Sequence, residues 1–237
     1  MPIQSLLFDL DGTLIDNSME TFLPPYFAAL TNKVAHLVAP DKLIAQLRAS
    51  TRAMAMNNDP TRTLADVFAA DFFPKIGLPR EQLTPLFDDF YACEYRDLRA
   101  FVQPLTIARE IVAHVFESRY TVVIATMPVF PQVAVQQRLE WGNLVDFPYA
   151  LVTAYENMHT SKPNPAFYRE IATHIGCAPG DCVMIGNEVE MDILPARHVG
   201  MKTFWVTDAG VPPADAPADW FGTLADLREL LKRGEFK

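Results

Sequence analysis

The spacing of apolar positions changes early in the chain. The run from Ser5 to Phe8 is short, apolar and bounded by a proline and a glycine, which predicts a buried strand. From Met19 to about Ala100, apolar residues instead recur every three or four positions, which is the period of amphipathic helices. Prolines separate the helices predicted in this span, which begin at Met19 and continue over Asp41–Met56, Thr63–Phe73 and Arg80–Leu98.

Helical and strand patterns alternate in the rest of the chain. The predicted helices cover Leu105–Ser118, Pro131–Glu140, Pro165–Ile175 and Asp192–Val199. The predicted strands lie between or after them, at Tyr120–Thr126, Tyr149–Ala154, Asp181–Gly186 and Lys202–Thr207. Strands separated by helices pair in parallel and carry helices on both faces. The pattern therefore predicts an α/β fold, a Rossmann-like doubly wound parallel sheet with an inserted all-helical domain.

The change of pattern also predicts the domain boundaries. Residues 1–17 and 102–237 are expected to form the α/β core domain, and residues 18–101 a helical domain inserted between its first strand and its next helix. In an open parallel sheet, ligands bind beyond the carboxyl ends of the strands. Residues at those ends are therefore the candidates for chemistry.

Composition and charge narrow the class of protein. Half of the 237 residues are hydrophobic, as in globular proteins, and the formal net charge is -9. This charge argues against nucleic acid or an anionic membrane surface as the main partner. Three cysteines without CxxC spacing make a disulfide framework or a zinc site improbable. With no leader-like segment and no charge-free run of roughly 18 residues, a cytoplasmic location is expected.

Two carboxylates directly follow the first predicted strand. Asp9 and Asp11 lie two residues apart in "FDLDGTL", where extended backbone would place both side chains on one face. Like charges raise each other's pKa, so this arrangement is costly without a counter-charge. A bound divalent cation removes that cost.

Four segments at the strand ends resemble, in order, the motifs of the haloacid dehalogenase superfamily, most of whose members are magnesium-dependent phosphatases. They are "FDLDGTL", Thr126, "SKPNPAFY" with Lys162, and "GNEVEMD". The match covers the whole α/β domain, and the helical insertion resembles the cap that the family places after its first motif. The resemblance implies Mg²⁺ as cofactor and a small phosphorylated metabolite as substrate.

The resemblance also implies the role of each matching residue. Asp9 would be the nucleophile that forms an aspartyl-phosphate, and Asp11 the general acid and then the base. Lys162 would neutralise both the Asp9 carboxylate and the phosphoryl oxygens. Thr126 and the Met127 N–H would bind phosphate, although Met127 and Pro128 follow Thr126 where the family usually carries an asparagine, and Pro128 offers no N–H.

The fourth motif departs from the family pattern. Asn187 stands where an aspartate is usual, Glu188 follows it, and Asp192 fills the second acidic position. Hard cations prefer carboxylate oxygens, so either Asn187 coordinates through its amide or Glu188 reaches the metal instead. The predicted metal residues are Asp9, Asp11, Asn187, Glu188 and Asp192.

The function predicted on these grounds is Mg²⁺-dependent hydrolysis of a small phosphomonoester by a monomer or homodimer. Two alternatives stay open: a phosphomutase with the same residues, and a non-catalytic binding or regulatory protein whose metal site has decayed. Carbon–halogen displacement is disfavoured because it does not need Asp11. The inserted domain offers Arg48, Arg52 and Arg62 as possible holders of a second anionic group. His159, close before Lys162, is the histidine nearest to a motif.

Overall fold

A parallel sheet forms the centre of the α/β region. The computed structural model describes residues 2–208 and 217–236. Its main sheet has six strands in the order β5-β4-β1-β6-β7-β8, and every neighbouring pair is parallel. The strands are β1 (Ser5–Phe8), β4 (Thr121–Ile124), β5 (Leu151–Val152), β6 (Cys182–Gly186), β7 (Lys202–Val206) and β8 (Trp220–Gly222). The α/β fold expected from the sequence is confirmed.

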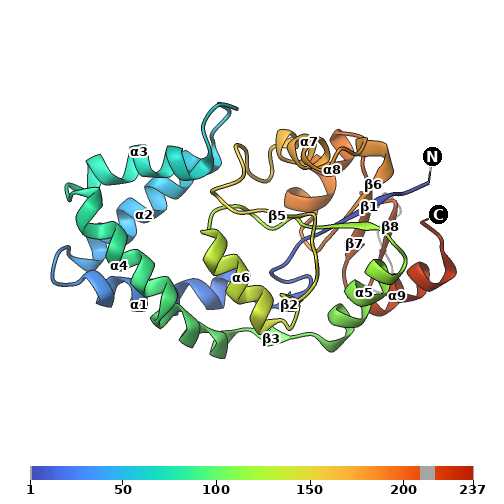
Figure 1. Ribbon diagram of the computed structural model, residues 1–237, viewed down its shortest axis with the longest axis horizontal. Coiled ribbons are helices and arrows are strands. Elements are labelled where there is room, and N and C mark those ends of the chain that lie inside the picture. Colours follow the sequence, from blue (N-terminus) through green and yellow to red (C-terminus); the bar gives the residue numbers. More distant parts are fainter. Residues whose placement is uncertain (1, 209–216, 237) are drawn as a thin grey trace.

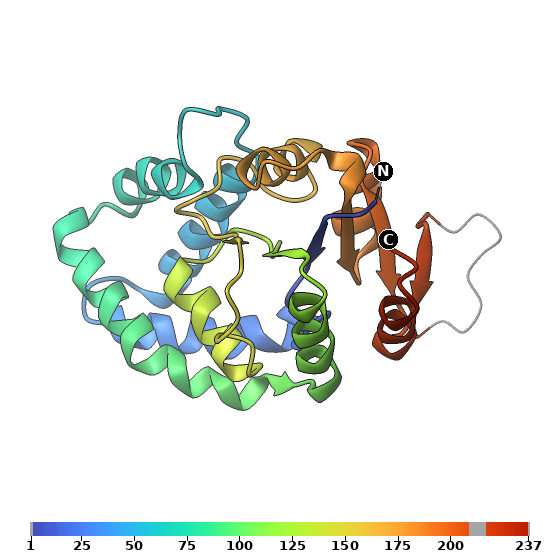
Figure 2. The ribbon, with the colours of Figure 1, turned by 45° about the vertical axis from the view of Figure 1, so that its right-hand side comes forward.

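Alternate residues of β1 enter two different cores. Leu6 and Phe8 belong to a core on one face of the sheet, whereas Leu7 belongs to a second core on the other face. This alternation follows from the two-residue period of a strand. Helices cover both faces (Figures 1 and 2). They are α5 (Thr106–Glu117) and α9 (Leu224–Arg233) on the first face, and α7 (Pro165–His174) and α8 (Leu194–His198) on the second.

Most of the segment between β1 and α5 is helical, as the apolar spacing predicts. We call residues 18–101 the helical region. It comprises α1 (Met19–Val34), α2 (Pro40–Ala55), α3 (Leu64–Ile76), α4 (Arg80–Ala92) and the 3₁₀ helix η1 (Glu94–Phe101). In Figure 1 these helices lie on the left, away from the two chain termini. The chain enters and leaves this region through β2 (Ile15–Asp16) and β3 (Gln103–Pro104), which pair antiparallel.

Two different contacts join the helical region to the α/β region. On one side, aromatic rings of α1 and η1 pack on Phe130 and Trp141, which flank and end α6 (Gln132–Trp141). On the other side, hydrogen bonds connect the α2–α3 connection to the segment before Lys162. Asn57 Nδ2 donates to the His159 carbonyl over 2.9 Å, and the Leu64 N–H donates to the Met158 carbonyl over 2.8 Å.

Some elements differ from the sequence-based expectation. The helix predicted over Arg80–Leu98 divides into α4 and η1, and the strand predicted over Tyr149–Ala154 shortens to β5. The helix predicted from Asp192 begins earlier, with a π-helical turn, η3 (Val189–Ile193), that runs into α8. The elements β2, β3, β8 and α9 were not predicted at all. Among the described residues, no helix combines the length and the apolar character that crossing a membrane requires.

Candidate active site

A buried lysine joins two carboxylates at the carboxyl end of the sheet. Asp9 directly follows β1, and Asp192 lies in η3 after β6. Lys162 Nζ lies 2.7 Å from Asp9 Oδ1 and 2.5 Å from Asp192 Oδ1, and only 2% of the Lys162 side chain is exposed. The first, third and fourth motif segments therefore meet in one ion-pair network.

The charges of this network depend on one another. Burial alone would lower the pKa of the Lys162 ammonium, but the Asp192 and Asp9 carboxylates raise it above its ordinary value. Burial also raises the pKa of Asp192, to about 6, although Lys162 opposes this rise. The buried Lys162 cation is thus held between the Asp9 and Asp192 side chains.

Asp11, the second aspartate of the first motif, has a cationic partner that was not predicted from the sequence. Arg138 in α6 forms an ion pair with Asp11 Oδ2, while Asn17 Nδ2 donates to Asp11 Oδ1 over 2.6 Å. The Arg138 side chain is 1% exposed, and its guanidinium lies 4.7 Å from the centre of the Phe130 ring. Burial raises the pKa of Asp11, and the Arg138 charge opposes that rise. The signal that could have pointed to it is the position of the charged Arg138 on the same buried face of α6 as Trp141, three residues later.

A threonine connects the first and fourth motifs. Thr13 Oγ1 lies 3.1 Å from Asp9 Oδ2 and 3.0 Å from Asn187 Oδ1, so two oxygen acceptors converge on one hydroxyl. Gly12 allows this approach: its φ is +78°, and a Cβ atom there would lie 2.7 Å from Asn187 Nδ2. The turn after β1 thus brings the Asn187 side chain next to the nucleophile candidate.

The predicted metal residues lie around one end of the site but are engaged in different ways. The Asp192 oxygens accept from Lys162 and from the Glu188 N–H, and the Asp11 oxygens are taken by Arg138 and Asn17. Across residues 2–208 and 217–236, no group of three His, Cys, Asp or Glu side chains is arranged to hold a metal ion.

A hard cation nevertheless has suitable donors here. The Asp9 and Asn187 oxygens that share the Thr13 hydroxyl are of the chemical type that Mg²⁺ prefers, and Glu188 lines the same cavity. The donor set therefore fits a magnesium ion with one carboxylate fewer than the motif pattern would provide.

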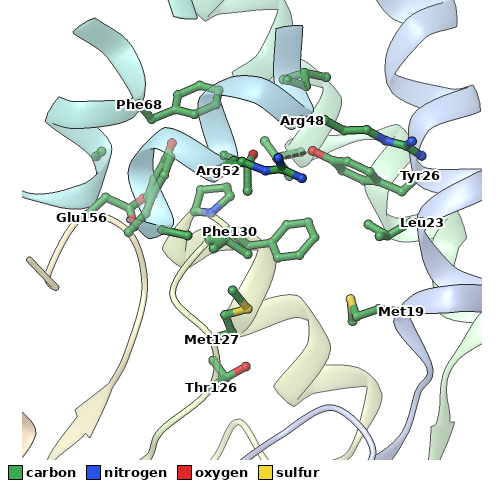
Figure 3. Close-up of a pocket in the computed structure, with 18 of the residues that line it drawn as sticks. Met19, Leu23, Tyr26, Arg48, Arg52, Phe68, Thr126, Met127, Phe130 and Glu156 are labelled. Carbon is green, nitrogen blue, oxygen red and sulfur yellow. Dashed lines mark hydrogen bonds between the residues drawn. The ribbon is translucent and has the colours of Figure 1, made fainter. Parts of the chain in front are cut away.

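The predicted phosphate-binding residues border the same space. Thr126 follows β4, is 2% exposed and lines the cavity together with Met127. The Thr126 carbonyl accepts from the Thr153 hydroxyl over 2.6 Å, whereas its own hydroxyl bonds to no other described residue. Figure 3 shows Thr126 and Met127 at one end of the cavity. The Thr126 hydroxyl is thus available to a ligand.

The cavity lies between the α/β region and the helical region and has a volume of about 750 Å³. Its α/β end, which we call the floor, carries Asp9, Asp11, Thr126, Lys162 and Asp192. Its opposite end, which we call the roof, belongs to the helical region and carries Arg48 and Arg52 of α2 (Figure 3).

Two other candidates lie outside this cavity. Arg62 is not among its lining residues, and one of its guanidinium nitrogens donates to the Asp66 carbonyl over 3.1 Å. His159 Nδ1 lies 2.7 Å from Glu170 Oε1, beside the connection between α2 and α3. The structure thus does not bring Arg62 or His159 to the predicted site.

The fold and the site define a Rossmann-like α/β protein with an aspartate–lysine centre under a helical insertion. Residues 159–229 match the family model of HAD-hydrolase-like proteins. The chain is 27% identical to the phosphoglycolate phosphatase of Xylella fastidiosa over 97% of its own length and 92% of that protein. The family model and this relative both support a protein of the haloacid dehalogenase-like hydrolase superfamily.

Two further comparisons give more limited support, one over about half of the chain and one for the fold alone. The chain is 27% identical to human N-acylneuraminate-9-phosphatase, but the match covers 55% of this chain and 54% of that protein. It thus spans about half the length of that relative. A crystal structure of a 2-haloacid dehalogenase from Pseudomonas syringae superposes with a TM-score of 0.64 over 98% of this chain and 99% of that one, at 20% identity. This likeness supports the fold.

Proposed function

We propose that the protein hydrolyses a small phosphomonoester through a phosphorylated Asp9. The observation that carries the proposal is the contact between Lys162 and Asp9 on the floor of a cavity that also exposes Asp11 and the Thr126 hydroxyl. The relatives named as phosphatases support the same class of reaction.

In the proposed reaction, an Asp9 carboxylate oxygen attacks phosphorus while the bond from phosphorus to the alcohol oxygen breaks. The Asp11 carboxyl gives its proton to that leaving oxygen. A water molecule then attacks phosphorus, Asp11 takes the proton of this water, and the bond to Asp9 breaks to release phosphate. The raised pKa of Asp11 supports its role as the proton donor.

The other residues neutralise and orient the phosphoryl group. Lys162 holds Asp9 in place and offers its charge to the phosphoryl oxygens, while the Thr126 hydroxyl and the Met127 N–H would bind them. A Mg²⁺ ion would be held by Asp9 and Asn187, with Glu188 beside them, and would supply positive charge against the phosphate when bound. The helical region would act as the cap that keeps water from the reacting centre.

Phosphate release from a panel of phosphorylated metabolites, with and without Mg²⁺, tests the proposal. The matched control is Asp9→Asn, which keeps the side-chain shape but removes the nucleophile. We expect Mg²⁺-dependent release by the wild type and none by the variant. Absence of release from every substrate would favour the non-catalytic alternative, whereas equal release by the wild type and Asp9→Asn would rule out Asp9 as the nucleophile. Transfer of phosphate to a second position without release would identify the mutase.

A further inference from the structure

The cavity is much larger than its phosphate-binding floor requires. Its volume of about 750 Å³ lies within the range of roughly 300–1,000 Å³ that is typical of sites for drug-sized ligands. In the proposed function, the floor groups bind a single phosphoryl group. The remaining space must accommodate the rest of the substrate, so its lining carries information on substrate class.

The walls of this space are apolar and partly aromatic. Leu23, Phe27, Phe68 and Phe130 are among its lining residues. Figure 3 shows Phe130 and Leu23 between Thr126 at one end and Arg48 and Arg52 at the other. An uncharged apolar body, such as an aromatic ring, is the chemistry that fits these walls.

Two tyrosines of the wall, Tyr26 and Tyr91, add no charge and little free hydrogen-bonding capacity. Tyr26 and Tyr91 direct their hydroxyls at each other over 2.9 Å, which engages both groups within the protein. Burial raises the pKa of Tyr26 to about 12, so its hydroxyl stays neutral. A substrate body passing these residues therefore meets mainly ring surfaces.

The helical region contributes three arginines to the cavity: Arg48 and Arg52 on α2, which form the roof, and Arg80 at the start of α4, whose guanidinium lies 5.6 Å from the centre of the Phe73 ring. Arg48 and Arg52 are four residues apart on α2, so they lie on the same face of the helix. Among the described residues neither of them forms an ion pair, whereas Arg138 on the floor side does. Arg48 lies over the Phe27 ring at 5.3 Å, a contact that leaves the guanidinium edge free for an anion.

Two acidic residues away from the floor, Asp88 and Glu156, also line the cavity, and among the described residues neither forms an ion pair with Arg48 or Arg52. Both carboxylate oxygens of Glu156 accept from the Gln132 N–H at the start of α6, over 3.0 and 2.9 Å. Two like charges four residues apart on a helix repel each other. An anionic ligand group between Arg48 and Arg52 would remove that repulsion and form charge-assisted hydrogen bonds with both.

We propose that the substrate is a phosphomonoester with an apolar body that ends in a second anionic group, held by Arg48 and Arg52. The second group is a carboxylate or another phosphate, since both offer the oxygens that a guanidinium binds. This inference rests on the proposed function: the floor binds the phosphate that is cleaved, and the roof selects the molecule by its far end.

Paired synthetic substrates test this inference. Phenylalkyl phosphates of several chain lengths would be compared with the same compounds carrying a carboxylate, or a second phosphate, on the ring. For the chain length that fits best, we expect the anionic compound to show at least a tenfold higher kcat/KM than its neutral partner, mainly through KM. The carboxylate and phosphate arms identify which second anion the roof accepts.

The same ratio of anionic to neutral kcat/KM is then measured in variants. Arg48→Gln and Arg52→Gln should bring the ratio close to one, whereas Arg62→Gln, an arginine of the same region outside the cavity, should keep it. A ratio near one for the wild type at every chain length, or an unchanged ratio in both cavity variants, overturns the inference while the hydrolase stands. If the wild type releases phosphate from none of these compounds or the metabolite panel, the proposed function itself fails.

Discussion

The floor and the roof of the cavity use charge in opposite ways. On the floor, Lys162 contacts two carboxylates and Arg138 contacts Asp11, so the buried cations have partners within the protein. On the roof, Arg48 and Arg52 line the same cavity without an ion pair among the described residues. The cations at one end of the cavity are therefore paired within the protein, whereas the two roof arginines at the other end are not.

This difference suggests that the floor residues serve catalysis and the roof residues serve substrate selection. Buried ion pairs cost much desolvation energy and persist where geometry is excellent, as expected of groups that must be ready before the substrate arrives. Unpaired arginines on an exposed helix cost little and remain free to bind a ligand. Substitutions on the floor should therefore have large effects on turnover, and those on the roof should change substrate choice.

Removing the nucleophile should have the largest effect. Asp9→Asn is expected to lower turnover by more than about a thousandfold, because an amide cannot accept the phosphoryl group. Lys162 keeps Asp192 as its partner, so the melting temperature should change little. Phosphate release and thermal unfolding of the same preparation measure both effects. Turnover close to that of the wild type would rule out the covalent route.

Removing Lys162, the cation that joins Asp9 and Asp192, should have the second-largest effect. Lys162→Ala is expected to lower turnover by about 10²–10³-fold, the usual cost of losing one charge-stabilising donor. It should also lower the free energy of unfolding by about 3–5 kcal/mol, because two buried carboxylates lose their counter-charge. Lys202→Ala is the matched control, since Lys202 pairs with Asp219 in a half-exposed position. Activity within about twofold of the wild type would show that Lys162 has no catalytic role.

Replacing Arg138, which pairs with Asp11 on the floor, should have a smaller effect on turnover than replacing Lys162. Arg138→Met should lower the free energy of unfolding by about 3 kcal/mol, because Asp11 remains buried without its cation. It should also reduce kcat by roughly tenfold or more, since Asp11 loses the contact that orients it. Arg138→Lys restores the charge without the planar fork and should recover only part of both losses. Urea unfolding and kcat are the measurements, and a Met variant equal to the wild type in both would contradict this role.

The fourth motif should give the smallest effect of the set. Asn187→Asp adds a carboxylate beside Asp9 and should tighten Mg²⁺ binding severalfold, measured by calorimetric titration without substrate. If Glu188 reaches the metal instead, Asn187→Asp would change little and Glu188→Gln would weaken binding strongly. Asp192→Asn removes a negative charge from the floor beside Lys162, so it should weaken Mg²⁺ binding in either case and is the control. Unchanged affinity in all three variants would show that the metal lies elsewhere.

Local patterns were sufficient to predict most of the fold. The first strand, Ser5–Phe8, lies where the apolar run and its glycine boundary indicated, and α1 begins at Met19 as expected. The elements that were not predicted depend on long-range pairing. The strands β2 and β3 are each two residues long and exist because the two ends of the helical region meet, which no local window reveals.

The site could be predicted in part for a similar reason. Asp9 and Lys162 follow recognisable motifs, and the structure brings them within 2.7 Å of each other. Arg138 belongs to no motif, so its contact with Asp11 could be found only from the packing of α6 against the floor. Arg48 and Arg62 are both arginines of the inserted region that belong to no motif, and only the position of the cavity shows which of them lines it.

The stereochemical course at phosphorus tests most directly whether Asp9 receives the phosphoryl group. A phosphomonoester made chiral at phosphorus with oxygen isotopes would be hydrolysed by the wild-type protein, and the configuration of the released phosphate determined. Transfer to Asp9 and then to water inverts phosphorus twice, so we predict net retention of configuration. Net inversion would show that water attacks the substrate directly and would contradict the account.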